Sequence, residues 1–385
     1  MIKRSLIGSL FLLVSLWVPN PLKSQEFKIL RELVLQLDNE TAYPFALGGR
    51  FQYCADINAI AYLNRLSRSI KYFDYASGKT LALETKLPSE GPNGFGMDPY
   101  YFDYQNKDSI FLLSAGTNFK MFLLNSLGKK INTFHYDSKD YESVPFPKAS
   151  RTTGALLFKY PYMFIAVHIG KNKERNSVSP IIKLDLRNDK FEYLEEPLPY
   201  EEIDLNRLPG SNQPEFYYSS IASGIRNDEF VVNYPMEDDL LLVSSEGYKN
   251  VNSKSSKIGN FKFLSRDLED YISREFPLLD VVVNSARYLG ILYNPYLSLY
   301  YRIGKAEGDT GDLRRSLNGE KKGRSYQYVV TVLDAKLNII NEELFNYKNA
   351  FFERGVFVSP DGLWTLSSDS SNEDEIKLKL MGFDN

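Results

Sequence analysis

The residues best suited to chemistry in this chain form a tyrosine-rich run in its C-terminal half. Five tyrosines lie between residues 288 and 301, with Asn294 inside the run and Arg302 directly after it. A tyrosine combines a flat apolar face with a hydroxyl group, and an arginine adds a fork of donors, so the set could stack on a sugar or grip a peptide. We predict a ligand-binding site made of Asn294, Tyr296, Tyr301 and Arg302. The alternative is that these side chains only pack between sheets.

Residues for catalysis or metal binding are sparse. The two histidines, His135 and His168, are too few for a histidine-rich zinc or copper site. His168 could be a general base facing a channel, or a hydrogen-bonded residue of a buried strand. The chain contains neither a G-x-S-x-G nucleophile motif nor a GxxxxGK[ST] phosphate loop. We predict no cofactor and no metal site, and we expect a protein that is not an enzyme.

Two acidic segments, 307–312 and 369–375, place several carboxylates close together, as a calcium ion requires. Neither has the complete pattern of a calcium-binding loop, so a solvated turn is the simpler interpretation.

The elements that would position these residues are recurring strand–turn–strand units. Each unit has an apolar, aromatic or β-branched run, a short polar turn, and a second such run. The turns are centred on Gly78, Gly128, Asn188, Gly247 and Lys336. The first four centres are 50 to 60 residues apart, and a further strand-like run precedes each unit. A regular period with three to four strands per repeat is the signature of a β-propeller.

The last repeat is one strand short. Residues 355–368 give two strands around a Pro-Asp-Gly turn, and residues 375–383 give a third. The N-terminal run Phe27–Leu37 could supply the fourth strand, which would remove exposed sheet edges by closing a ring. We therefore predict an all-β fold, a six-bladed β-propeller closed by pairing of the N-terminal strand with the C-terminal blade. Residues 261–276 have helical spacing and predict a short helix between two blades.

The first 24 residues resemble an export signal. Lys3 and Arg4 precede a short apolar stretch, Leu6–Val18, which is too short to span a membrane. We predict a signal peptide at 1–24 and a single six-bladed β-propeller domain at 25–385. The protein is then exported, either periplasmic or extracellular and associated with the cell surface. No later segment predicts a transmembrane helix.

Cysteine and charge narrow the partners. The only cysteine, Cys54, cannot form an intramolecular disulfide and lies too far beyond the apolar stretch to carry a lipid, so no lipid anchor is expected. The formal net charge is −3, and removal of the basic signal segment makes it more negative. A mildly acidic surface without a basic stripe argues against nucleic acid as a partner.

Three segments, EGPNGFGMDPYYFDY, YLGILYNPYLSLYYRIG and VSPDGLWTLSS…EDEIKLKLMGF, resemble the domain-of-unknown-function 4221 family of Bacteroidota, which is similar to six-bladed TolB-like propellers. The resemblance covers essentially the whole mature chain and implies export and a propeller. It supplies no established activity and no catalytic residues. Many members look like lipoproteins, and the position of Cys54 departs from that pattern.

From these observations we expect an exported, non-catalytic binding or interaction module for a glycan, a peptide or an envelope protein. One alternative is a hydrolase or lyase acting at the central channel with carboxylates and a bound cation. Another is a structural scaffold in an envelope complex. A cluster of acidic residues, Asn and His at the channel mouth would favour the enzyme, whereas Tyr and Arg would favour binding.

Overall fold

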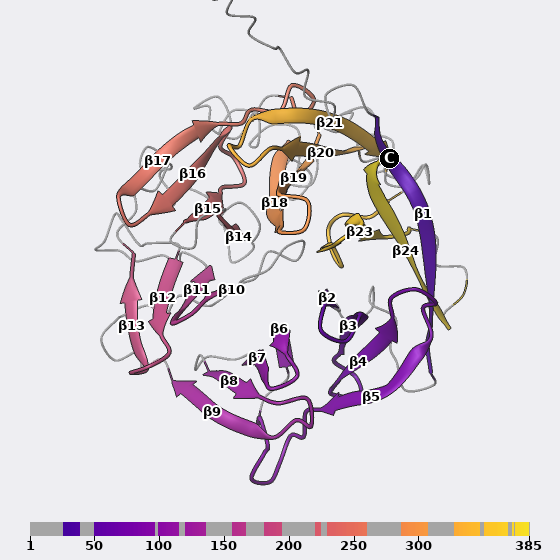
Figure 1. Ribbon diagram of the computed structural model, residues 1–385, viewed down its shortest axis with the longest axis vertical. Coiled ribbons are helices and arrows are strands. Elements are labelled where there is room, and N and C mark those ends of the chain that lie inside the picture. Colours follow the sequence, from indigo (N-terminus) through magenta and orange to yellow (C-terminus); the bar gives the residue numbers. More distant parts are fainter. Residues whose placement is uncertain are drawn as a thin grey trace, which may run out of the picture.

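The computed structural model describes most of the chain and shows a ring of β-sheets. The described residues are 26–38, 50–96, 99–114, 120–135, 156–166, 181–194, 220–224, 229–259, 286–306, 327–346, 350–368, 372 and 374–384. They form six four-stranded antiparallel sheets that surround a central axis as blades (Figure 1). The predicted all-β, six-bladed propeller is confirmed. The predicted signal peptide at 1–24 and helix at 261–276 lie outside the described residues.

The blades follow the chain, and each is numbered here from its innermost to its outermost strand. Blade 1 contains β2 (Phe51–Cys54), β3 (Ala59–Asn64), β4 (Ser69–Asp74) and β5 (Thr80–Lys86). Blade 2 contains β6 (Pro99–Asn106), β7 (Ser109–Ser114), β8 (Lys120–Leu124) and β9 (Lys130–His135). Blade 3 contains β10 (Leu156–Lys159), β11 (Tyr162–Ala166), β12 (Ile181–Asp185) and β13 (Lys190–Tyr193).

The second half of the ring repeats this order. Blade 4 contains β14 (Ser220–Ser223), β15 (Phe230–Asn233), β16 (Asp239–Ser244) and β17 (Gly247–Asn252). Blade 5 contains β18 (Arg287–Asn294), β19 (Leu299–Lys305), β20 (Gln327–Leu333) and β21 (Ile339–Asn346). Blade 6 contains β22 (Phe357–Ser359), β23 (Gly362–Leu366), β24 (Glu375–Phe383) and β1 (Phe27–Gln36). Each predicted strand–turn–strand unit is therefore the outer pair of strands of one blade.

The ring closes through β1, as the sequence predicts. This N-terminal strand pairs antiparallel with β24 from Phe27, opposite Phe383, to Gln36, opposite Glu375. It is the outermost strand of blade 6 (Figure 1). The two ends of the described chain thus meet in one sheet, which leaves no blade without two neighbours.

A β-bulge lets β1 fill the cores on both sides of blade 6. Phe27 and Ile29 pack in the core between blades 5 and 6, whereas Leu33 and Leu35 pack in the core between blades 6 and 1. In a regular strand all four residues would face the same side. The register shift between Ile29 and Arg31 reverses the alternation, because a bulge inserts one extra residue.

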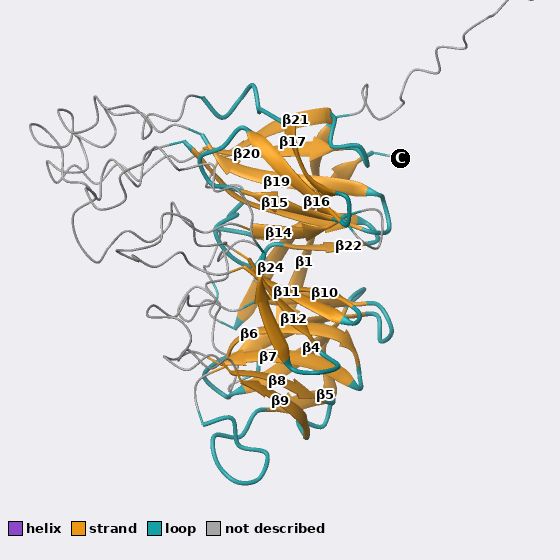
Figure 2. Ribbon diagram, turned by 90° about the vertical axis from the view of Figure 1, so that its left-hand side faces the viewer, coloured by secondary structure: helices purple, strands orange, loops and turns teal. Residues whose placement is uncertain are grey.

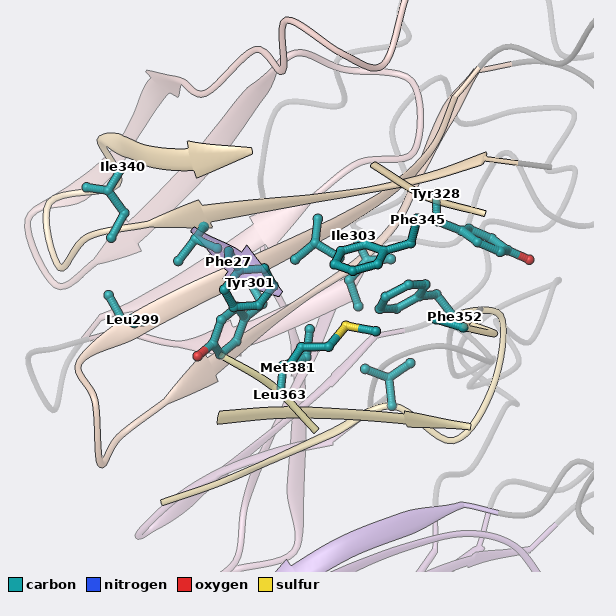
Figure 3. Close-up of a cluster of buried hydrophobic side chains, with 14 residues drawn as sticks. Phe27, Leu299, Tyr301, Ile303, Tyr328, Ile340, Phe345, Phe352, Leu363 and Met381 are labelled. Carbon is teal, nitrogen blue, oxygen red and sulfur yellow. The ribbon is translucent and has the colours of Figure 1, made fainter. Parts of the chain in front are cut away.

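The hydrophobic cores lie between adjacent blades. Figure 3 shows the core between blades 5 and 6, where Phe27 lies near Tyr301 and Phe345. The Phe27 ring centroid is 5.8 Å from that of Tyr301 and 6.4 Å from that of Phe345. Aromatic side chains fill these wide gaps because each buries a large apolar area in a rigid ring.

Glycines at the outer turns allow each blade to contact the preceding one. Gly78 and Gly128 have φ values of +70° and +74°, which side chains with a Cβ rarely adopt. A Cβ on Gly78 would lie 2.1 Å from the carbonyl oxygen of Val34 in β1, and a Cβ on Gly128 would lie 2.0 Å from that of Lys86 in β5. Both turns therefore require glycine for packing as well as for conformation.

The turn residue with positive φ was correctly predicted in three blades and missed by one position in two. Gly247 has a φ of +119°, as expected. In blades 3 and 5 the positive φ falls on Asp189 and Leu337, one residue after the predicted centres Asn188 and Lys336. The left-handed residue commonly closes such a turn rather than standing in its middle.

The turns between the first and second strands of each blade lie on the same side of the ring as those between the third and fourth strands, and we call this side the turn face. It includes residues 55–58, 75–79, 295–298 and 360–361. In Figure 2 the turn face points to the right, on the side of the C-terminus. None of the described segments forms a helix with the length and apolar character of a membrane span.

We expect that deletion of β1, residues 27–36, removes most of the stability of the fold. The deletion would expose an edge of β24 and open the cores on both sides of blade 6. Thermal and urea unfolding would measure the loss, and an unchanged melting temperature would show that closure is not required.

Leu35 and Leu30 provide a matched pair of point variants in the same strand. Leu35 is fully buried, and Leu30 is 37% exposed. Leu35→Ala should lower the free energy of unfolding by about 2–5 kcal/mol, as for other buried leucines. Leu30→Ala should change it by about 0.5 kcal/mol or less.

Candidate binding site on the turn face

The four residues predicted to bind ligand have different positions in the structure. Asn294, Tyr301 and Arg302 are buried, each with 0% exposure, and Tyr296 is 49% exposed. Tyr301 and Arg302 are neighbours in β19, so their side chains point to opposite sides of blade 5. For direct contact with a ligand the prediction is wrong for the three buried residues, because packing between blades leaves them no surface to offer.

Arg302 connects blades 4 and 5. Its guanidinium carbon lies 3.3 Å from the ring centroid of Tyr288. Its Nε donates to Oδ1 of Asn233 at 2.8 Å, and its terminal nitrogens donate to the backbone carbonyl oxygens of Glu237 at 2.5 Å and Asp238 at 2.6 Å. A buried cation is tolerated only when its donors are satisfied. Arg302 therefore serves the interface between blades and not an external ligand.

Asn294 positions the turn that presents Tyr296. Its Nδ2 donates to the backbone carbonyl oxygen of Ser359 at 2.7 Å, which ties blade 5 to blade 6. Its Oδ1 accepts the backbone N–H of Tyr296 at 3.0 Å and that of Leu297 at 3.3 Å. An asparagine that bonds its own turn in this way fixes the path of the backbone. Asn294 is thus a positioning residue for an exposed tyrosine.

Tyrosines from two blades meet at the turn face. The ring of Tyr296, from blade 5, lies edge-to-face with that of Tyr53, from β2 of blade 1, at 6.1 Å between centroids. Tyr53 in turn lies 4.8 Å from Tyr75, which follows β4. Blade 6 stands between blades 5 and 1, and its innermost strand, β22, has only three residues. The contact therefore crosses the inner end of blade 6.

Asp361 and Arg31 provide the charges of this site. Oδ2 of Asp361 accepts a hydrogen bond from the Tyr75 hydroxyl at 2.8 Å and one from Nη2 of Arg31 at 3.0 Å. The Arg31 guanidinium carbon also lies 5.2 Å from the ring centroid of Trp364. The side chains of Arg31 and Asp361 are 39% and 48% exposed, so both are accessible to a partner.

Buried donors hold the inner side of this site. The Trp364 indole nitrogen donates to the Ser359 hydroxyl at 3.0 Å, and that hydroxyl lies 2.7 Å from the hydroxyl of Tyr75. Burial raises the pKa of Tyr75. Burial, followed by the negative charge of Asp361, raises the pKa of Tyr53. Both hydroxyls therefore keep their protons at neutral pH and can donate hydrogen bonds.

We call Arg31, Tyr53, Tyr75, Tyr296 and Asp361 the tyrosine cluster. Sequence reasoning found only Tyr296 among them. The bond between Tyr75 and Asp361 joins residues 286 positions apart, and local patterns do not report such pairs. The available signals were the predicted Pro-Asp-Gly turn, which contains Asp361, and the predicted closure strand, which contains Arg31.

A second polar group lies between the innermost strands β2 and β6. Asp103 is 7% exposed, and its two carboxylate oxygens accept hydrogen bonds from Gln52 at 3.3 Å and Gln105 at 2.9 Å. Burial raises the pKa of the Asp103 carboxyl, against the opposing effect of the Arg50 charge. Gln52 also exchanges two hydrogen bonds of 2.8 Å with the backbone of Tyr104. The group thus links blades 1 and 2.

Other candidate groups contribute little to a site. Within the described ranges there is no cluster of three or more His, Cys, Asp and Glu side chains that could hold a metal ion. His135 is exposed at the end of β9. His168 and the acidic segment 307–312 lie outside the described residues, as does most of segment 369–375. Cys54 is buried and its pKa is raised, chiefly by burial, so its thiol is a poor nucleophile.

Comparisons with known proteins agree with this architecture. A family model described as a domain of unknown function (DUF4221) matches residues 33–344. A structure of a DUF4221 member from Bacteroides vulgatus matches with a TM-score of 0.72 and 17% identity, over 94% of this chain and 98% of that chain. A Bacteroides fragilis protein that is expected to be exported matches with a TM-score of 0.56 and 11% identity, over 94% and 95% of the two chains. No curated protein matches in sequence.

Tyr301 and Tyr296 should respond differently to truncation. Tyr301→Ala should lower the free energy of unfolding by about 3–5 kcal/mol, because it removes a buried ring from the core between blades 5 and 6. Tyr296→Ala should lower it by about 1 kcal/mol or less, because that ring is half exposed. Urea unfolding measures both, and equal losses would contradict the assignment of Tyr296 to the surface.

Asp103 should make stability depend on pH. Its folded-state pKa is raised by burial, so its contribution is complete below the unfolded pKa of about 3.9 and is lost as the pH rises through the folded pKa. Asp103→Asn cannot ionise, so its free energy of unfolding should rise relative to wild type as the pH increases from about 3 to about 7. The exposed Asp108→Asn is the matched control. A difference between Asp103→Asn and wild type that does not vary with pH would refute the role of burial.

Proposed function

This chain belongs to the DUF4221 family, a domain of unknown function, and from that premise we propose that it is an exported binding module which holds a polypeptide partner at its turn face. The tyrosine cluster is the observation that carries the proposal. It combines an exposed tyrosine, two partly buried or buried tyrosines and an accessible Arg–Asp pair from three blades. Tyrosine and arginine are the residue types that most often dominate the binding energy of protein interfaces.

The rigidity of the cluster supports binding. Tyr296 is held by the Asn294-bonded turn, and Asp361 is held by Arg31 and Tyr75. Side chains fixed before binding lose little conformational entropy when a partner arrives, so more of the contact energy remains as affinity. The wide origin of the cluster, from blades 1, 5 and 6, also places its residues over a broad surface.

A polypeptide fits the cluster better than a glycan does. Leu297, which follows Tyr296, is 41% exposed and adds an aliphatic side chain to the same turn. An apolar anchor beside a tyrosine suits a partner that brings its own apolar side chains. The Arg31–Asp361 pair offers a donor and an acceptor side by side at the rim, as protein interfaces commonly do.

The cluster offers little for catalysis. Asp361 is its only carboxylate, whereas hydrolysis of a glycosidic bond by carboxylates normally uses two. The tyrosine hydroxyls of Tyr53 and Tyr75 keep their protons, since both pKa values are raised. A binding role is therefore favoured over the hydrolase or lyase alternative. Export is supported by the signal-like start of the chain and by the exported relative from Bacteroides fragilis.

The test is a screen of the full mature chain against a displayed library of random peptides, followed by affinity measurement on the recovered peptides. Tyr296→Ala should weaken binding by about 2 kcal/mol, as for a hot-spot tyrosine, with little change in melting temperature. Tyr248→Ala is the matched control, because Tyr248 is 56% exposed but lies on β17 of blade 4.

Three outcomes would contradict the proposal. Recovery of no binding peptide is one, and equal loss of affinity in the Tyr296 and Tyr248 variants is another. A glycan array run in parallel provides the third. Glycan binding that is lost only in Tyr296→Ala would keep the site and replace the polypeptide with a carbohydrate partner.

A further inference from the structure

The interface between blades 3 and 4 departs from the pattern of the other five. At those five, the outermost strand of the preceding blade sends apolar side chains toward its neighbour: Leu33 and Leu35 of β1, Leu81 and Leu83 of β5, Phe134 of β9, Val251 of β17, and Ile340 and Phe345 of β21. In β13 the corresponding side chains are Lys190 and Glu192. They lie opposite Asp185 and Lys183 in the β12–β13 register, on the side of blade 3 that faces blade 4.

A pocket of about 490 Å³ lies where these charges replace apolar packing. Its polar lining residues are Tyr162, Lys183, Asp185, Asn188, Lys190 and Glu192. The volume is within the range of pockets that hold small organic ligands. All these residues belong to blade 3, so the pocket is separate from the tyrosine cluster on blades 1, 5 and 6.

Two of the charged groups in the pocket are already matched. Asp185 accepts hydrogen bonds from Nε of Arg187 at 2.9 Å and from Nη2 of Arg187 at 2.7 Å. Glu192 lies 3.4 Å from the Lys183 ammonium. That ammonium also lies 4.4 Å from the ring centroid of Tyr162, so a face of this ring is covered by a cation and is not open for stacking.

Lys190 gives the pocket a net positive charge. Three cations, Lys183, Arg187 and Lys190, face two carboxylates, Asp185 and Glu192. The hydrogen bond from Arg187 lowers the pKa of Asp185 to about 2, so Asp185 stays ionised at neutral pH and the balance of charge holds there. A ligand that carries one negative charge would complete the balance.

The remaining polar groups indicate the rest of the ligand. The lining contains acceptors in Asp185 and Glu192, and it contains groups that both donate and accept in Asn188 and the Tyr162 hydroxyl. Hydroxyl groups match such a mixture, because each can donate one hydrogen bond and accept others.

We propose that this pocket binds a small polyhydroxylated carboxylate of the uronic acid class. The Lys190 ammonium takes the carboxylate, while Asn188, Glu192 and the Tyr162 hydroxyl bind the ring hydroxyls. The inference does not rest on the polypeptide-binding function proposed for the turn face.

The experiment is calorimetric titration of the full mature chain with glucuronate and galacturonate, with glucose as the neutral probe. Binding should be saturable for a uronate, weaker for glucose, and weaker still at higher ionic strength. Lys190→Glu should reduce uronate affinity about tenfold or more, because it replaces attraction by repulsion at the carboxylate. Lys249→Glu is the matched control, since Lys249 is an exposed lysine of the outermost strand of blade 4.

Both lysines are exposed, and melting temperatures measured alongside confirm that each variant folds. Tyr162→Phe, which keeps the ring and removes the hydroxyl, is a second variant and should weaken binding without unfolding the blade. Absence of saturable uronate binding, equal affinity for glucose, or equal effects of the Lys190 and Lys249 changes would overturn the proposal. Tight binding of an acidic peptide but of no uronate would also overturn it.

Discussion

Closure of the ring by β1 is the constraint on which the rest of the structure depends. The cores lie between blades, so a blade contributes fully only when it has a neighbour on each side. β1 supplies the outermost strand of blade 6 and, through its bulge, sends Phe27 to one core and Leu35 to the other. The same reversal directs Arg31 toward blade 1, where it meets Asp361 and the ring of Tyr75. The closure and the tyrosine cluster therefore share one local feature of one strand.

Polar contacts between blades set the positions that the apolar cores leave free. Arg302 bonds the turn after β15, Asn294 bonds the turn of blade 6, and Gln52 bonds the backbone of β6. Burying such groups has a cost unless every donor finds a partner, so they specify geometry more than they add stability. The orientation of Tyr296 follows from this, because Asn294 is held by blade 6 while it holds the Tyr296 turn.

The fold could be predicted from the sequence because its signals are local and repeated. Alternating apolar residues, polar turns and a regular period are visible without any knowledge of contacts, and the missing strand of the last repeat indicates the closure. The site could be predicted only in part. A buried tyrosine such as Tyr301 and an exposed one such as Tyr296 occur in the same run, and a turn between them decides which is which. The bulge at Ile29–Arg31 has no signal in the alternation of β1, so the position of Arg31 could not be inferred.

Departures from the repeat are the places where function is best sought in such a fold. A closed ring holds each blade from both sides, so one interface can lose apolar contacts at its outer edge without losing its neighbours. The three-residue β22 and the charged β13 are two such departures. The first brings tyrosines of blades 1 and 5 together across blade 6, and the second opens a charged pocket beside blade 4. Neither change improves packing, which is the physical reason to look for a ligand at each.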